Sequence, residues 1–311
     1  MNDPKIVLYD FEGEKSLSDE FREELRHRSS ELRVVETAED YSGKLGSEHL
    51  EGAQVLISRV FDDYPQELFQ DSEIEYIGVM ATDKSHYPLD FLEDRGIEIS
   101  NAPEYARESV AELTVNMMLT LSLNSYMTTD FVESGKWDVG PFPGKELRGK
   151  KLGIIGLGSI GSRVAEIASG LGMEICYNSR SEKEFAAERG WKFLKLNDLI
   201  SKSDVNSIHC SLNRETENLL NKEILDKIEG EKVILNGARS EIQDVEKTIE
   251  LCERGRLKVW FDALEDQEQR ENLLSAGNAV LTSHSGCATK EAKERLKQKT
   301  LENLDNYLGE K

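Results

Sequence analysis

The stretch that decides the fold is Lys151-Leu-Gly-Ile-Ile-Gly156-Leu-Gly158-Ser-Ile-Gly161. An apolar strand is predicted to end in Gly-x-Gly-x-x-Gly, and a helical pattern follows before a second strand at Met173–Tyr177. In such a βαβ unit the first glycine permits a tight turn, and the second lets the backbone approach a pyrophosphate. The third lets the helix pack closely, and the helix N-terminus offers N–H groups to phosphates. The pattern therefore predicts a dinucleotide site, whose residues are Gly156, Gly158, Ser159, Ile160 and Gly161.

The end of the second strand bears on which dinucleotide binds. An NAD site usually carries Asp or Glu about 20 residues after the glycines, where it binds the ribose 2′-hydroxyl. Here this place holds Tyr177-Asn178-Ser179-Arg180, which includes no acid. Ser179 is neutral, and Arg180 can pair with a 2′-phosphate. We therefore expect NADP(H) to be preferred, with NAD(H) as the alternative if Asn178 or Ser179 holds the ribose.

The composition of the chain limits its partners. Its 311 residues suggest two domains, and 39 Lys plus Arg against 60 Asp plus Glu give a formal net charge of −21. This balance argues against binding to nucleic acid or to an anionic membrane, which both require a basic face. Such acidity is compatible with a high-salt, halophilic source or with an ordinary acidic protein. The sequence does not separate these two alternatives.

The four cysteines are scattered and have no metal-binding spacing, so no metal site is expected. The N-terminus shows no signal-peptide pattern, and no apolar run approaches membrane-spanning length. A reducing, cytoplasmic location is the natural expectation.

The order of predicted elements indicates an α/β protein with two Rossmann-like domains, each built on a doubly wound parallel sheet. The first domain is expected at residues 1–100 plus 286–311, and the dinucleotide-binding domain at residues 101–285. A long amphipathic segment from Ser109 to about Phe131 is expected to be one connecting helix. The last helix, Lys290–Leu308, is expected to return to the first domain. Strands are predicted at Ile6–Tyr9, Leu32–Val35, Val55–Ile57, Tyr76–Met80, Ile97–Ile99, Val205–His209, Lys232–Leu235, Lys258–Phe261 and Ala279–Thr282.

Polar residues follow three successive strands of the second domain. They are Arg239, Asp262 with the acidic loop after it, and His284. The carboxyl ends of parallel strands share one edge, where ligands bind. An Arg can hold a 2-oxo acid bidentately, and a His with an ordinary pKa of about 6.5 can exchange the carbonyl proton during hydride transfer. His209 and Trp260 are more simply read as structural residues.

In these motifs the chain resembles the D-isomer-specific 2-hydroxyacid dehydrogenases over nearly its whole length, and most closely the glycerate dehydrogenase and glyoxylate/hydroxypyruvate reductase branch. The resemblance is carried by the Gly156–Gly161 loop, Asn236-Gly-Ala-Arg239, Phe261-Asp262, Thr282-Ser-His284 with Gly286-x-Ala-Thr289, and Glu75-Tyr-Ile-Gly-Val-Met-Ala-Thr82. It implies an NAD(P)-dependent dehydrogenase that acts as a reductase of a short 2-oxo acid, an active-site cleft between the domains, and a homodimer.

The resemblance also implies roles for individual residues. Arg239 binds substrate, His284 is the acid/base, and Gly237 and Asp262 belong to the cofactor site, with Asp262 at the nicotinamide carboxamide. The backbone at Ala81, Thr82 and Asp83 holds the substrate carboxylate.

The chain departs from the family pattern at two of these places. The catalytic Glu of the family is replaced by Gln267, which can hydrogen-bond His284 but carries no charge; Glu265 or Glu268 are alternatives. Asp83 stands where the family has Gly, and an Asp there repels an anionic substrate unless it points away. These departures motivate a second hypothesis, a sensor or interaction protein that binds the dinucleotide without turnover.

Overall fold

The computed structural model describes residues 3–11, 17–37, 45–59, 63–138 and 140–309, with the side chain of Phe11 left out. The chain divides into two compact units, Met1–Tyr105 with Lys290–Lys311, and Ala106–Thr289. These divisions fall a few residues after the boundaries expected from the sequence. Each unit is an α/β structure with one parallel sheet, which confirms the predicted fold class.

Unit 1 carries a five-stranded sheet in the order β2-β1-β3-β4-β5, in which every neighbouring pair is parallel. This is the second common order of doubly wound sheets, and its connections reverse between β1 and β3. The elements are β1 (Lys5–Phe11), α1 (Asp19–Arg26), β2 (Glu31–Thr37), the 3₁₀ helix η2 (Ser47–Leu50), β3 (Val55–Ser58), α2 (Glu67–Gln70), β4 (Tyr76–Val79), α3 (Leu89–Asp94), β5 (Glu98–Asn101) and α12 (Lys290–Gly309).

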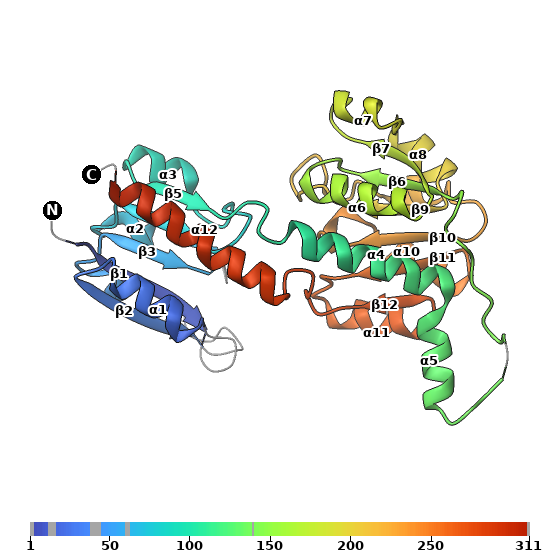
Figure 1. The fold of residues 1–311 in the computed structure, drawn as a ribbon, viewed down its shortest axis with the longest axis horizontal. Coiled ribbons are helices and arrows are strands. Elements are labelled where there is room, and N and C mark those ends of the chain that lie inside the picture. The colour runs from blue at the N-terminus through green and yellow to red at the C-terminus, as the bar shows by residue number, and fades with distance from the viewer. Residues whose placement is uncertain (1–2, 12–16, 38–44, 60–62, 139, 310–311) are drawn as a thin grey trace. The chain divides into compact units, whose positions relative to one another are not determined.

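The core of unit 1 forms two layers because alternate residues of a strand point to opposite faces. Val7 and Tyr9 of β1 pack on one face with residues of α2 and α3. Ile6 and Leu8 pack on the other face with residues of α1 and α12. Tyr307 of α12 stacks on Tyr76 of β4 with ring centroids 4.4 Å apart. The last helix therefore belongs to the first unit, as predicted, and Figure 1 shows it in red along the sheet.

Unit 2 carries a seven-stranded parallel sheet in the order β12-β11-β10-β9-β6-β7-β8. The connections reverse at β6 and β9, which places the ligand crevice of such folds at the carboxyl ends of these strands. The elements are α4 (Arg107–Leu123), α5 (Ser125–Glu133), β6 (Lys151–Ile155), α6 (Ser159–Gly170), β7 (Glu174–Asn178), α7 (Glu184–Glu188), β8 (Lys192–Phe193), α8 (Leu196–Lys202), β9 (Val205–Ile208), α9 (Lys222–Leu225), β10 (Lys232–Asn236), η3 (Ser240–Ile242), α10 (Val245–Glu253), β11 (Leu257–Phe261), α11 (Gln267–Ser275) and β12 (Ala279–Leu281).

Helices cover both faces of this second sheet. Residues of α4, α6 and α7 pack on one face, together with Trp260 of β11. Residues of α8, α9, α10 and α11 pack on the other, together with Phe261. Strands buried on both faces are consistent with the apolar runs that predicted them.

The single helix predicted from Ser109 to Phe131 is wrong, because the chain breaks it at Asn124. This residue takes the left-handed conformation (φ 56°) and ends α4. Its side chain donates to the carbonyl of Pro143 (2.9 Å) and accepts from Nζ of Lys258 (2.7 Å). Both partners are remote in sequence, so the helical periodicity gave no sign of the break.

Candidate active site

Two glycines shape the turn between β6 and α6. Gly156 has φ +95°, and a Cβ on it would lie 2.6 Å from the backbone nitrogen of Cys210. A Cβ on Gly161 would lie 2.2 Å from the carbonyl oxygen of Gly156. Both positions therefore require glycine, for the tight turn and for close packing of α6.

The middle glycine leaves space for a ligand. A Cβ on Gly158 would meet no atom within 4 Å, and this residue is the N-cap of the twelve-residue α6. The first N–H groups of a helix have no intrahelical partner. The hydroxyl of Ser159 is buried and has no hydrogen-bond partner among the described residues, and Ile160 beside it is half-buried. An open approach, free backbone donors and an unpaired hydroxyl fit the diphosphate of a dinucleotide.

The end of β7 carries no acid. Asn178 uses its amide to donate to the carbonyl of Leu194 (2.8 Å), and Ser179 donates to the carbonyl of Ser181 (2.7 Å). Arg180 is exposed and has no ion pair with any residue that the structure describes. A cationic side chain is thus available where an NAD site usually has a carboxylate.

The loop after β10 presents Arg239. Asn236, which is buried, accepts from the N–H of Ala238 (3.1 Å) and donates to the carbonyl of Arg239 (3.0 Å). This side chain closes the loop on itself. Gly237 packs against the ring of Trp260, because a Cβ on Gly237 would lie 3.1 Å from ring atoms Cη2 and Cζ3. Arg239 is half-buried, and its guanidinium has no hydrogen bond or ion pair with any residue that the structure describes, so it is free to bind an anion.

The loop after β12 presents His284 in an uncommon backbone conformation. His284 has φ +53°, and its N–H donates to the carbonyl of Asp262 (2.6 Å). A non-glycine residue at positive φ persists only where its surroundings impose it. The imidazole itself is exposed.

The carboxylate of Asp262 holds this loop. Its Oδ1 accepts from the hydroxyl of Thr282 (2.6 Å) and the N–H of Ser285 (2.9 Å), and its Oδ2 accepts from the N–H of Gly286 (2.9 Å). A Cβ on Gly286 would lie 2.8 Å from Oδ2. Asp262 thus orients the turn that carries His284, a role that the motif alone did not reveal; its contact with a nicotinamide remains a prediction.

The acidic loop after β11 does not reach His284. Gln267 begins α11, and its amide donates to Glu271 (2.9 Å). Arg270 binds the carbonyls of Leu264 and Glu265, and Glu268 is exposed in the first turn. In the part of unit 2 that is described, the imidazole of His284 has no hydrogen bond to Glu265, Gln267 or Glu268.

A second histidine lies at the point where the strand order reverses. His209 follows β9, its N–H donates to the carbonyl of Ile155 (2.8 Å), and its Nε2 lies 2.7 Å from the hydroxyl of Ser207. Burial lowers the pKa of His209 to about 4. Its ring is therefore neutral at pH 7 and serves the sheet as a hydrogen-bonding group.

In unit 1, the loop Ala81–Asp83 follows β4. The carbonyl of Ala81 accepts from the N–H of Ala102 (2.9 Å), and the carbonyl of Thr82 accepts from the amide of Asn101. The carboxylate of Asp83 accepts from the N–H (2.9 Å) and the hydroxyl (2.7 Å) of Ser85. Burial raises the pKa of Asp83, but these hydrogen bonds outweigh it and leave the pKa below its ordinary value. The charge thus points into the residue's own turn.

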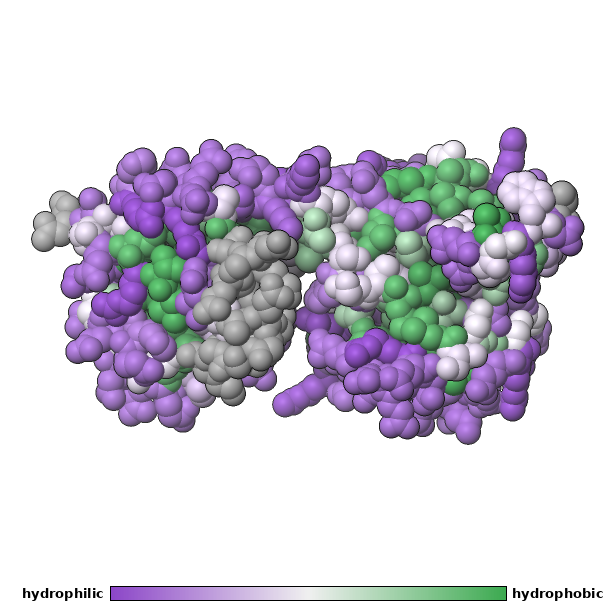
Figure 2. Space-filling view, turned by 90° about the horizontal axis from the view of Figure 1, so that it is seen from below, coloured by the Kyte–Doolittle hydropathy of each residue, from purple (hydrophilic) through white to green (hydrophobic). Residues whose placement is uncertain are grey.

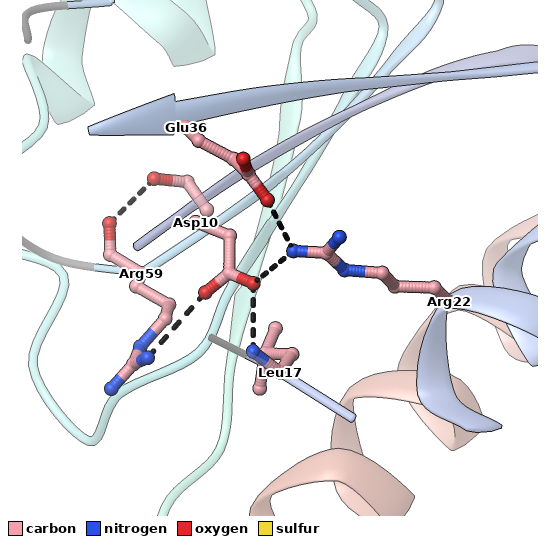
Figure 3. A network of polar contacts seen from close by, with 6 residues as sticks. Asp10, Leu17, Arg22, Glu36 and Arg59 are labelled. Carbon is pink, nitrogen blue, oxygen red and sulfur yellow. Dashed lines mark hydrogen bonds and ion pairs between the residues drawn. The ribbon is translucent and has the colours of Figure 1, made fainter. Parts of the chain in front are cut away.

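Unit 1 also holds a charged network that the sequence analysis did not predict (Figure 3). The fully buried Asp10 is the penultimate residue of β1 and contacts Arg22 (3.2 Å), Arg59 (3.5 Å) and the N–H of Leu17 (2.8 Å). Arg22 also pairs with Glu36 (2.7 Å). Asp10 lies near the carboxyl end of β1 and Arg59 directly follows β3, and these are the two strands where the order of this sheet reverses. Only the topology brings these residues together, so sequence spacing gave no signal.

Among the described residues, no group of His, Cys, Asp and Glu side chains has the arrangement of a metal site. Within the same residues, every helix is too short or too polar to span a bilayer.

Comparison with known proteins identifies the class. The family model "D-isomer specific 2-hydroxyacid dehydrogenase, NAD binding domain" matches residues 115–286, more than half of the chain. The chain belongs to the D-isomer-specific 2-hydroxyacid dehydrogenases, as the resemblance predicted. It is an NAD(P)-dependent oxidoreductase that uses a nicotinamide cofactor, and the alternative of a non-catalytic binding protein is not favoured.

Individual relatives support this assignment. The chain is 29% identical to a hydroxypyruvate reductase of Blautia hydrogenotrophica, over 78% of this chain and 79% of the relative. It is 33% identical to a glyoxylate reductase of Aeropyrum pernix, over 76% of this chain and 74% of the relative. Among solved structures, a D-lactate dehydrogenase of Aquifex aeolicus complexed with NAD and lactic acid is 25% identical. It matches with a TM-score of 0.86 and covers 97% of this chain and 95% of that one.

Proposed function

We propose that this protein is an NADP(H)-dependent reductase of glyoxylate or hydroxypyruvate. The observation that carries the proposal is the pair of loops after β10 and β12. They present an unpaired Arg239 and an exposed His284 at the carboxyl ends of the strands of one parallel sheet. The glycine loop after β6 lies at the same edge. Relatives named glyoxylate and hydroxypyruvate reductase favour a short 2-oxo acid.

The chemistry follows from these side chains. The fork of Arg239 binds the carboxylate and polarises the carbonyl of the 2-oxo acid. His284, in its protonated form, gives a proton to the carbonyl oxygen as the alcohol forms. A bound nicotinamide supplies the hydride. The backbone of Ala81–Asp83 is the proposed partner of the substrate carboxylate in unit 1, which is compatible with an Asp83 charge that Ser85 engages.

The cofactor preference rests on the end of β7. No carboxylate is present to bind a ribose 2′-hydroxyl, and Arg180 is available for a 2′-phosphate. A charge-assisted contact with phosphate is stronger than a neutral one. NADPH is therefore proposed to bind better than NADH.

The experiment is reduction of glyoxylate, hydroxypyruvate and pyruvate with NADPH and with NADH, followed by absorbance at 340 nm. The expected result is turnover with the first two acids and a higher kcat/KM with NADPH. Turnover with none of the short 2-oxo acids would overturn the proposed function.

The protein is also proposed to form a homodimer through α5. Every described residue of this nine-residue helix is at least partly exposed, and Leu123 (47% exposed), Val132 (44%) and Trp137 (85%) leave apolar surface around it. A shallow groove there is lined by Leu123, Ser125, Thr128, Thr129 and Val132, with Glu133 as the single charged residue of its lining. Figure 2 shows hydrophobic and near-neutral residues gathered on this unit, amid a mostly hydrophilic surface.

A second copy is the occupant that the charge favours. Two chains of −21 each repel one another, so they associate best where charges are sparse, and a twofold contact places the same patch on both sides. Sedimentation should show a dimer that Val132→Asp dissociates and that Leu274→Asp, at an exposed residue of α11, leaves intact. A monomeric wild type would contradict this proposal.

A further inference from the structure

We infer that Trp260 is a positioning residue for the reaction, which couples the loop of Arg239 to the loop of His284 through Thr282 and Asp262. This inference rests on the proposed roles of Arg239 and His284. It assigns a function to an indole that the sequence pattern presents as a core residue.

The loop of His284 needs such support because of its place in the sheet. It follows β12, a strand of three residues at the end of the sheet, whose single partner strand among the described residues is β11. Segments next to short edge strands have few backbone partners and open readily. The positive φ of His284 adds strain that the surroundings must hold.

A chain of hydrogen bonds from β11 supplies that support. The indole Nε1 of Trp260 donates to Oγ1 of Thr282 (2.9 Å), and this hydroxyl donates to Oδ1 of Asp262 (2.6 Å). The hydroxyl of Thr282 accepts the indole N–H through a lone pair. Its single proton therefore points away from the indole and toward the carboxylate of Asp262. The same carboxylate then accepts from the N–H groups of Ser285 and Gly286 and so sets the turn around His284.

The same indole supports the substrate-binding loop. Trp260 is fully buried and pairs in register with Leu235 of β10 and Val280 of β12, so it lies between the two strands that precede the loops. Atoms Cζ3 and Cη2 of its ring lie 3.1 Å from the position of a Cβ on Gly237. One rigid ring therefore touches the Arg239 loop with its far edge and the His284 loop with its N–H. Spacing errors of about 1 Å between reacting groups cost large factors in rate.

The test separates the N–H from the bulk of the ring. Trp260→Phe keeps an aromatic side chain and removes the donor, while Thr282→Val keeps the shape and removes the hydroxyl. Each should lower kcat about three- to tenfold, the rate equivalent of one hydrogen bond, with KM for NADPH unchanged. Thr282→Ser keeps the hydroxyl and should restore the wild-type kcat. The double variant should be no slower than the slower single variant, because both break one chain of contacts.

Hydrogen exchange decides the inference without relying on turnover. The amides of Ser285 and Gly286 should exchange faster in Trp260→Phe and in Thr282→Val than in the wild type. Trp191→Phe is the matched control, since Trp191 is a buried residue of the same unit that contacts Phe185 and Arg189 through its ring. This variant should leave both kcat and exchange unchanged.

Two outcomes distinguish the two failures. If the wild type reduces no 2-oxo acid but exchange still rises as stated, the proposed function fails and the coupling of the loops stands. If the wild type is active and Trp260→Phe matches Trp191→Phe in kcat and in exchange, the positioning role of Trp260 is overturned.

Discussion

At the scale of single residues, the glycine turn after β6 and the side chains after β10 and β12 could be located from the sequence, because each follows an apolar strand in a characteristic spacing. Gly156 and Gly161 take the strained and crowded positions that the motif requires. The bonding of Asp262 to Thr282, Ser285 and Gly286 was not accessible, since it depends on the turn that follows a different strand. The hydrogen bond of Gln267 could not be predicted from the sequence either: its amide donates to Glu271 of its own helix and not to His284.

Cofactor selectivity should depend on Arg180. Arg180→Ala should weaken the binding of NADPH by about 1.5–3 kcal/mol, the value of a charge-assisted contact, and should leave the binding of NADH nearly unchanged. Fluorescence titration with both cofactors measures this. Arg254→Ala, at the C-cap of α10, removes the same charge and should alter neither affinity. Equal losses for NADPH and NADH in Arg180→Ala would contradict the assignment.

Stability should depend on pH through His209. Its folded pKa of about 4 lies below the unfolded value of about 6.5, so the unfolded chain binds more protons between these values. Stability is then full above pH 6.5 and falls as pH drops toward 4, by at most about 3 kcal/mol from this group. Urea unfolding of wild type and His209→Gln at pH 7.0 and 5.0 should show a smaller loss in the variant. Identical losses would mean that His209 titrates normally.

At the scale of elements, strands with continuous apolar runs were predictable because they are buried on both faces. The junction of α4 and α5 was not, since Asn124 is held by Pro143 and Lys258 from other parts of the unit. The two-residue β8 is too short to give any pattern.

Within α6, two glycines should respond oppositely to substitution. Gly161→Ala places a methyl group 2.2 Å from the Gly156 oxygen, so it should lower stability by about 1–3 kcal/mol and abolish tight NADPH binding. The methyl group added by Gly170→Ala, at the end of the same helix, would have no atom within 4 Å. This variant should raise the free energy of unfolding by up to about 1 kcal/mol. Denaturant unfolding and cofactor titration of both variants check this. Unchanged cofactor binding in Gly161→Ala would show that α6 does not need its close approach to β6.

At the scale of the whole molecule, the formal net charge of −21 follows directly from the amino-acid composition. Screening of its self-repulsion should raise the melting temperature as KCl increases from about 0.01 M, where the Debye length is about 30 Å, to about 1 M, where it is about 3 Å. A melting temperature that stays flat or falls with KCl would remove the halophilic interpretation.

The central claim is that His284 acts as the acid of the reaction, and one comparison tests it most directly. We expect His284→Ala to lower kcat for hydroxypyruvate reduction by about 10²–10⁴-fold, because positioned proton transfer contributes this much. NADPH affinity should stay unchanged, since the glycine loop and Arg180 are intact. His27→Ala, at the exposed C-cap of α1, is the control and should keep full turnover. A His284→Ala variant that turns over at the wild-type rate would contradict the account.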